Sequence, residues 1–146
     1  MVDLYAKDDK QACVDLFVDV FTHEPWRYAW MRADSITRYF ADMARTPGFL
    51  GLVMKEDGIL LGFCFGLMTD YFNGVNYEIK EIAVARACQR QGMGSRLLAQ
   101  AEQWLQKKGV NTITLATRRD IGAYAFYMKN SYDVSEAALY LYKNLQ

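Results

Sequence analysis

The sequence predicts an α/β protein with a mixed β-sheet, and three features of the chain lead to this prediction. Residues 77–108 pass from an apolar strand, through a polar turn with two glycines, into an amphipathic helix whose apolar positions recur at helical spacing. Turns at 56–58 and 73–74 separate three strand-like segments, which indicates an antiparallel meander. The helix then leads to another strand at 111–117, so a strand–helix–strand crossover extends the meander into a mixed sheet.

Local signals at the ends of each segment place the remaining elements. In the first part of the chain they predict a strand at 2–5, a helix capped by Asp8 or Asp9 and ended by Pro25, and a helix capped by Asp34 or Ser35 and closed by Pro47-Gly48. In the rest they predict strands at 49–54, 59–68 and 75–85, a helix at 122–129, and two final strands at 132–135 and 138–143. With no linker or repeat in sight, residues 1–146 are expected to form one domain.

Composition favours a globular protein and excludes several classes of partner. The chain has 146 residues, of which 52% are hydrophobic, enough to build a sizeable core. Its formal net charge is zero, so no strong field favours nucleic acid or an anionic membrane. No apolar run reaches the roughly 18 residues that suggest a membrane-spanning helix. We therefore expect no nucleic-acid and no membrane partner.

The cysteines and the N-terminal residues favour a cytoplasmic protein. Cys13, Cys64 and Cys88 are odd in number and widely separated, which fits neither a disulfide framework nor a metal site. The first ten residues lack the basic and apolar regions of a secretory signal. No group of His, Cys or carboxylate residues has the spacing of metal ligands, so no metal is expected.

The segment Gln89-Arg90-Gln91-Gly92-Met93-Gly94 lies where the strand gives way to the central helix. Free amide groups and the helix dipole make such a position suitable for an anion, above all a phosphate. Neither of two common phosphate motifs is present, because the chain has no GxxxxGKS/T and no GxGxxG after a first strand. The alternative is a glycine-rich turn that binds nothing.

Three segments together resemble the GNAT superfamily of acetyl-CoA-dependent N-acetyltransferases. QRQGMG at 89–94 is similar to the pyrophosphate loop Q/R-x-x-G-x-G/A of that family, and the preceding IAV is similar to its fourth strand. AYAFYMKNSY at 123–132 resembles its AxxFYxKxGF segment. The resemblance implies about seven strands and about four helices, with strands four and five splayed apart and acetyl-CoA in the gap.

The resemblance also assigns the cofactor contacts. It implies that main-chain groups of the fourth strand pair with pantetheine, that the loop amides hold pyrophosphate, and that the segment before the last helix contributes further contacts. The implied cofactor-binding residues are Ile82, Ala83, Val84, Gln89, Arg90, Gln91, Gly92, Met93, Gly94, Ser95, Arg96, Asp120 and Ala123. Two positions depart from the family pattern: Asp120 replaces a common Asn, and Ser131 replaces a common Gly.

Glu78, Glu81 and Tyr127 are the candidate catalytic residues. An amine with a pKa near ~10.4 must lose a proton before it attacks a thioester, and a carboxylate can accept that proton. Glu78 and Glu81 each match an acidic position of some relatives. In a regular strand they face opposite sides unless a bulge intervenes, and the resemblance implies that a bulge is common here, so the sequence does not choose between them. The alternative for each is a surface ion pair with Lys80 or Arg86.

Tyr127 matches the tyrosine that protonates the departing thiolate in the family. A phenol with a pKa near ~10 is a suitable acid for this step. The alternative is a core tyrosine that packs with Ala123 and Phe126.

An aromatic loop after the first helix is the candidate acceptor site. Glu24, Trp26 and Tyr28, with Tyr71 and Tyr77 elsewhere, have the aromatic and acidic character that suits a cationic amine. The alternative is that the loop aromatics fold back on the core. His23 is the only histidine, and it has no GxSxG nucleophile to serve, so it is expected to be structural or acceptor-side.

The function that follows is N-acetylation. We expect direct transfer of an acetyl group from acetyl-CoA to a primary amine of a small molecule or peptide, by general acid–base catalysis. The alternative is a CoA-binding sensor or interaction module without catalysis, which needs the loop but not the carboxylates. The resemblance also implies a homodimer. The identity of the amine is not readable from the sequence.

Overall fold

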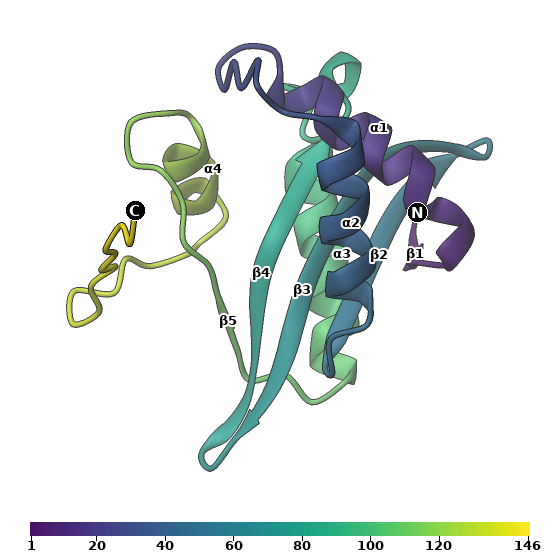
Figure 1. Ribbon diagram of the computed structural model, residues 1–146. Helices are drawn as coiled ribbons and strands as arrows, with labels where there is room; N and C mark the ends of the chain where they lie inside the picture. The colour runs from purple at the N-terminus through teal and green to yellow at the C-terminus, as the bar shows by residue number, and fades with distance from the viewer. The chain divides into compact units, whose positions relative to one another are not determined.

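The computed structural model describes residues 1–146, which form two compact units, Met1–Leu115 and Ala116–Gln146. The first unit contains one five-stranded sheet in the order β1-β2-β3-β4-β5 (Figure 1). The strands β1 to β4 pair antiparallel, whereas β4 and β5 pair parallel. Their bounds are β1 Val2–Leu4, β2 Phe49–Glu56, β3 Ile59–Tyr71, β4 Gly74–Val84 and β5 Thr112–Thr114. The mixed α/β sheet expected from the sequence is confirmed.

Helices cover both faces of this sheet. Helices α1 (Lys10–Phe21) and α2 (Ala33–Ala44) lie on one face, and α3 (Met93–Lys107) lies on the other (Figure 1). None of the helices has the length and apolar character that a membrane crossing needs. Helix α3 buries the apolar stripe expected from its spacing: Leu97, Leu98, Ala101 and Leu105.

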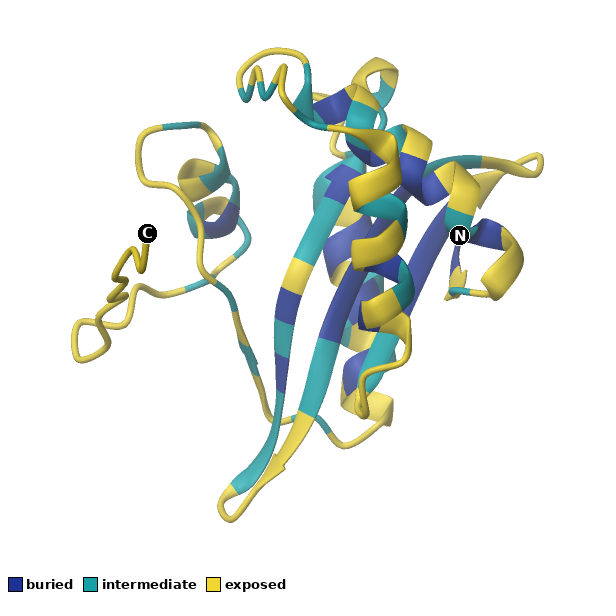
Figure 2. Cartoon of the chain, in the orientation of Figure 1, coloured by how far each residue is buried: buried dark blue, intermediate teal, exposed yellow.

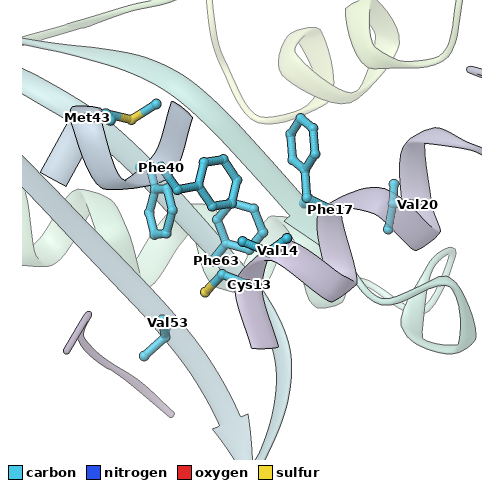
Figure 3. Close-up of a cluster of buried hydrophobic side chains, with 10 residues drawn as sticks. Cys13, Val14, Phe17, Val20, Phe40, Met43, Val53 and Phe63 are labelled. Carbon is cyan, nitrogen blue, oxygen red and sulfur yellow. The ribbon is translucent and has the colours of Figure 1, made fainter. Parts of the chain in front are cut away.

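The main core lies between α1, α2 and the sheet. Side chains from both helices meet large residues of β2 and β3, and Figure 2 shows the resulting buried stripe on each helix. The ring of Phe40 is 5.0 Å from that of Phe65 and 5.4 Å from that of Phe17. Figure 3 shows this core cluster and labels Cys13, Val14, Phe17, Val20, Phe40, Met43, Val53 and Phe63. Because Phe40 is anchored there, the position of α2 on the sheet is well defined.

The starts of the two N-terminal helices differ in part from prediction. A 3₁₀ turn, η1 (Lys7–Asp9), precedes α1, and Asp9 is the N-cap residue of α1 as predicted, but its side chain accepts a hydrogen bond from the Ala6 amide and none from α1. Asp9 also forms an ion pair with Lys55 of β2, which explains why this carboxylate is buried. Helix α2 begins at Ala33, so Asp34 lies inside the first turn, where a carboxylate still suits the helix dipole.

Helix α4 (Ala123–Lys129) is the regular element of the second unit. The two strands predicted at 132–135 and 138–143 are wrong, because residues 130–146 contain no strand. An alternating apolar pattern makes a strand only where a neighbouring strand takes up its backbone groups, and this segment has none. Its side chains are accordingly exposed, for example Leu139 at 82% and Leu141 at 83% (Figure 2).

Helices α3 and α4 end in the same kind of C-terminal cap. After α3, the amides of Val110 and Gly109 donate to the carbonyls of Leu105 and Gln106, and Gly109 has φ +87°. After α4, the Tyr132 amide donates to the Tyr127 carbonyl and the Ser131 amide to that of Met128. Both are Schellman motifs, whose central position requires a left-handed backbone.

Ser131 occupies that left-handed position of α4 with φ +69°, which explains why relatives carry glycine there. We expect Ser131→Gly to stabilise α4 by about 1 kcal/mol, because glycine adopts this conformation without the steric cost of a Cβ atom. Hydrogen–deuterium exchange of the α4 amides measures the change. The reverse exchange, Gly109→Ser at the end of α3, should lower protection there; equal protection in all variants would contradict the prediction.

Candidate active site

The second half of β4 has an open edge. The pairing of β4 with β5 runs only from Asn76–Thr112 to Glu78–Thr114. Beyond this point β4 continues to Val84, paired with β3 alone. The splay expected between these two strands is therefore present, and β5 is shorter than predicted because it diverges from β4. Main-chain groups on this side of Ile79–Val84 have no strand partner, and apart from the Val84 carbonyl, which accepts a hydrogen bond from the Gln89 side chain, they are available to an extended ligand.

A β-bulge on β4 changes which way its carboxylates point. Glu81 lies opposite Phe65, and Ile79 lies opposite the next residue of β3, Gly66, so Lys80 is an extra residue without a partner. Glu78 lies opposite Leu67, two residues from Phe65. Residues two apart on a strand share a face. The bulge therefore brings Glu78 and Glu81 to the same face of the sheet, which a regular strand would not do.

Glu81 is partly buried and has one specific partner. The Tyr39 hydroxyl on α2 donates a hydrogen bond to Oε2 of Glu81 over 2.7 Å. Burial raises the pKa of Glu81 above its usual range, while the Tyr39 hydrogen bond and the nearby Lys80 charge act in the opposite direction. A carboxylate with a raised pKa is a stronger base, and it accepts a proton more readily near neutral pH.

Glu78 is engaged differently. Lys80 Nζ lies 3.3 Å from Glu78 Oε1, so the surface ion pair considered for both carboxylates applies to Glu78. Arg86 pairs with neither, because its guanidinium makes a bidentate contact with Asp19 of α1 at 2.9 and 3.1 Å. The environment thus distinguishes the two carboxylates and favours Glu81 as the base.

The loop before α3 has the form of an anion site. A 3₁₀ turn, η2 (Arg86–Cys88), leads into it, and Gly92 caps α3 with φ +78°. The amides of residues 90–94 donate no hydrogen bond within the protein, and a Cβ atom at Gly92 would meet nothing within 4 Å. Arg90 and Gly92 both have a left-handed backbone, a feature of the turns in which successive amides form anion-binding nests.

The two glutamines of this loop have structural roles. Gln89 Nε2 donates to the Val84 carbonyl over 3.0 Å, which ties the loop to the end of β4. Gln91 Nε2 donates to the Ala87 carbonyl, also over 3.0 Å. The side chains of Arg90 and Arg96 remain exposed and supply positive charge near the free amides.

In the aromatic loop 22–32, some side chains pack on the core and others are exposed to a possible acceptor. The ring of Trp26 lies 4.8 Å from that of Phe21 and packs against the core, whereas Trp30 is 74% exposed. The rings of Tyr28 and Trp30 are 5.3 Å apart. Glu24 forms an exposed ion pair with Arg27, which offsets the negative charge expected to attract an amine.

Three other residues considered for the acceptor site lie in different environments. Tyr71 is exposed beside the tip of the β3–β4 hairpin, where it is open to a ligand. The expectation that Tyr77 contributes to the acceptor site is wrong, because Tyr77 is fully buried and its hydroxyl donates to the Leu50 carbonyl over 2.8 Å. His23 contacts the Asp19 carbonyl through Nδ1 at 2.6 Å, a structural role.

Tyr127, Asp120 and Ala123 belong to the second unit. Tyr127 is buried in α4, with the rings of Phe126 and Tyr132 at 5.1 and 5.5 Å. Arg118 binds Asp120 through two hydrogen bonds of 2.6 and 3.0 Å, and this contact lowers the pKa of Asp120. Ala123 is the first residue of α4.

A partly buried carboxylate on a bulged strand, an open strand edge and a glycine loop at the start of α3 agree with the comparison with known proteins. The profile of the acetyltransferase (GNAT) family matches residues 11–132 of this chain. The chain belongs to the GNAT acetyltransferase family. The matched region spans most of the first unit and continues into the second through α4. The chain matches no curated protein sequence.

Several solved structures share this fold at low sequence identity. Aminoglycoside antibiotic 6'-N-acetyltransferase AAC(6')-IG from Acinetobacter haemolyticus has TM-score 0.75 and 15% identity, covering 100% of this chain and 99% of that chain. An aminoglycoside acetyltransferase from an uncultured soil metagenomic sample, in complex with sisomicin, has TM-score 0.74 and 18% identity, covering 100% and 96%. A transcriptional regulator from Bacillus halodurans C-125 has TM-score 0.78 and 18% identity, covering 98% and 99%. These similarities establish the fold and leave the acceptor open.

Proposed function

We propose that this GNAT family member is an acetyl-CoA-dependent N-acetyltransferase that acts on a primary amine of a small molecule or peptide. The observation that carries the proposal is the partly buried Glu81, whose pKa is raised by burial on the bulged, open-edged strand β4. A purely CoA-binding sensor needs the loop 89–94 but has no use for such a base. The family match, which extends into both units, supports treating residues 1–146 as one catalytic domain.

The residues present fit acetyl-CoA as cosubstrate. The unbonded amides of Arg90–Gly94, with Ser95 next in sequence, form a cradle of the right chemistry for pyrophosphate, and Gly92 leaves it open. The main chain of Ile82, Ala83 and Val84 lies on the open edge, where it would pair with pantetheine. Arg90 and Arg96 would add charge, Met93 and Gly94 form the first helical turn, and Asp120 and Ala123 are proposed contacts from the second unit.

Each proposed catalytic group handles one proton or one charge. When bound, acetyl-CoA supplies the thioester that the amine attacks. Glu81 accepts a proton from the ammonium form of the acceptor, which frees the nitrogen lone pair. A main-chain amide of the β4 edge would hold the negative oxygen that develops during attack. Tyr127 gives its phenolic proton to the departing sulfur, and Glu78 is assigned a supporting electrostatic role through Lys80.

The acceptor that best suits the surface is a small amine with several positive charges. Exposed aromatic faces in the loop 22–32 and at Tyr71 attract cations, and the proposed substrate-binding residues are Glu24, Trp26, Tyr28 and Tyr71. The aminoglycoside acetyltransferases among the structural neighbours support an aminoglycoside as the first candidate. A polyamine and the terminal amine of a peptide are the other members of the test panel.

Release of free CoA thiol in the presence of each amine tests the proposal. Saturable, amine-dependent release with an acetylated product detected by mass spectrometry is the expected result. Tight binding of acetyl-CoA with no transfer to any amine of the panel would favour the sensor, and failure to bind acetyl-CoA would overturn both functions.

Replacement of Tyr127 by Phe tests the proposed acid. We expect kcat to fall by roughly 100-fold, the lower end of general acid catalysis, because phenylalanine has no proton to give. Affinity for acetyl-CoA should remain unchanged, since the ring is kept. Steady-state kinetics with calorimetric titration measures both quantities. Tyr124→Phe, on an exposed tyrosine of the same helix, is the matched control. Equal activity of the two variants would remove Tyr127 from the mechanism.

A further inference from the structure

Tyr39 links helix α2 to the proposed base across 42 positions of sequence. Its hydroxyl donates to Oε2 of Glu81 over 2.7 Å. The next residue, Phe40, is 1% exposed and holds α2 against the sheet through Phe63 and Phe65. The backbone at Tyr39 is therefore fixed by the core, and its phenol reaches Glu81 from an anchored position.

We propose that Tyr39 is a positioning residue that holds the Glu81 carboxylate in one orientation through Oε2 and leaves Oε1 as the oxygen that receives the proton. This inference rests on the proposed function, because it assigns a task to the base of that reaction. A carboxylate on a free side chain rotates among several orientations, and fixing it in advance saves the entropy of doing so during the reaction.

The proton balance of this step involves two groups only. An N–H bond of the acceptor ammonium breaks, and an O–H bond forms at Oε1, so both the amine and Glu81 become neutral. Tyr39 keeps its proton throughout. Burial, and next the negative charge of Glu81, raise the pKa of Tyr39 far above its usual range, so the phenol stays a donor at any working pH.

The same hydrogen bond tunes the basicity of Glu81. The groups that act on Glu81 are Tyr39 from α2 and Lys80 from β4, with Glu78 close enough to affect Tyr39 itself. From α1, Asp19 is engaged with Arg86. Because the phenol stabilises the ionised carboxylate, its removal raises the pKa of Glu81 further. More of the base is then protonated at neutral pH, and the acid limb of the rate profile moves to higher pH.

Tyr39→Phe tests the inference with two independent readouts. The first is a carbon-13 NMR titration of the Glu81 carboxyl in the protein without ligand, assigned with Glu81→Gln. We expect its pKa to rise by roughly one unit, as one lost hydrogen bond to a charged group predicts. The second is the pH profile of kcat/KM, whose acid limb should move by the same amount, with KM for acetyl-CoA unchanged.

Thr37→Ala is the matched control, since it removes a hydroxyl of α2 that binds only the Ala33 carbonyl. This variant should reproduce the wild-type titration, and thermal unfolding checks that both variants remain folded. An unchanged pKa of Glu81 in Tyr39→Phe overturns the inference whatever the activity. A wild-type protein that binds acetyl-CoA and acetylates no amine overturns the proposed function instead, so the two failures are distinguishable.

Discussion

We expect Glu81→Gln to lower kcat/KM by roughly 100- to 1,000-fold at neutral pH, within the range that general base catalysis provides. Glutamine keeps the size of the side chain and can still accept a hydrogen bond from Tyr39, but its amide does not take a proton from an ammonium group. The deficit should shrink at alkaline pH, where the acceptor loses its proton to solvent without help. A pH series of initial rates at amine concentrations well below KM, with saturating acetyl-CoA, measures both effects.

The sign of the wild-type pH dependence follows from the burial of Glu81. Its pKa lies above the usual carboxyl range, so activity is present above that raised pKa and is lost as pH falls through it. Glu81→Gln should lack this acid limb. Glu78→Gln is the control. Because Glu78 already pairs with Lys80, this substitution should lower activity much less. A larger loss in Glu78→Gln than in Glu81→Gln would exchange the two assignments.

The choice between these carboxylates depends on a structural feature that the sequence alone does not determine. A period-two pattern places residues 78 and 81 on opposite faces, and only the bulge at Lys80 brings them together. A bulge depends on the register with β3, which the local sequence of β4 does not encode. Tyr39 was missed for a similar reason: helical spacing indicates which face of a helix a residue lies on, but it does not show that the Tyr39 hydroxyl contacts a residue 42 positions away.

Other features were predictable to the extent that local rules determine them. The meander, helix α3 and the glycine loop were found because periodicity and turn residues act within a few positions. The final strands were wrong because pairing depends on a distant partner. The partial burial of Trp26 and the complete burial of Tyr77 likewise depend on packing against elements far away in sequence.

The double variant Gly92→Glu, Gly94→Glu should lose affinity for acetyl-CoA by at least about 100-fold, equivalent to about 2.7 kcal/mol. Gly92 has φ +78°, a conformation that costs a residue with a Cβ atom about 1–2 kcal/mol. The rest of the loss is electrostatic, since two carboxylates would stand beside the free amides that are proposed to receive pyrophosphate. Calorimetric titration with acetyl-CoA and with its 3′-dephospho form measures the affinity.

Two single variants separate backbone strain from charge in this result. Gly92→Ala adds only a Cβ atom, which meets nothing within 4 Å, so it should weaken binding by no more than about 30-fold, the effect of about 1–2 kcal/mol of strain alone. Gly109→Ala carries the same kind of strain, at φ +87°, at the opposite end of α3 and should leave binding unchanged. If Gly109→Ala weakened binding as much as the glutamates did, the loss would reflect the stability of α3. If the double variant bound acetyl-CoA normally, the loop would be a turn without a ligand, and the proposed cofactor site would fall with it.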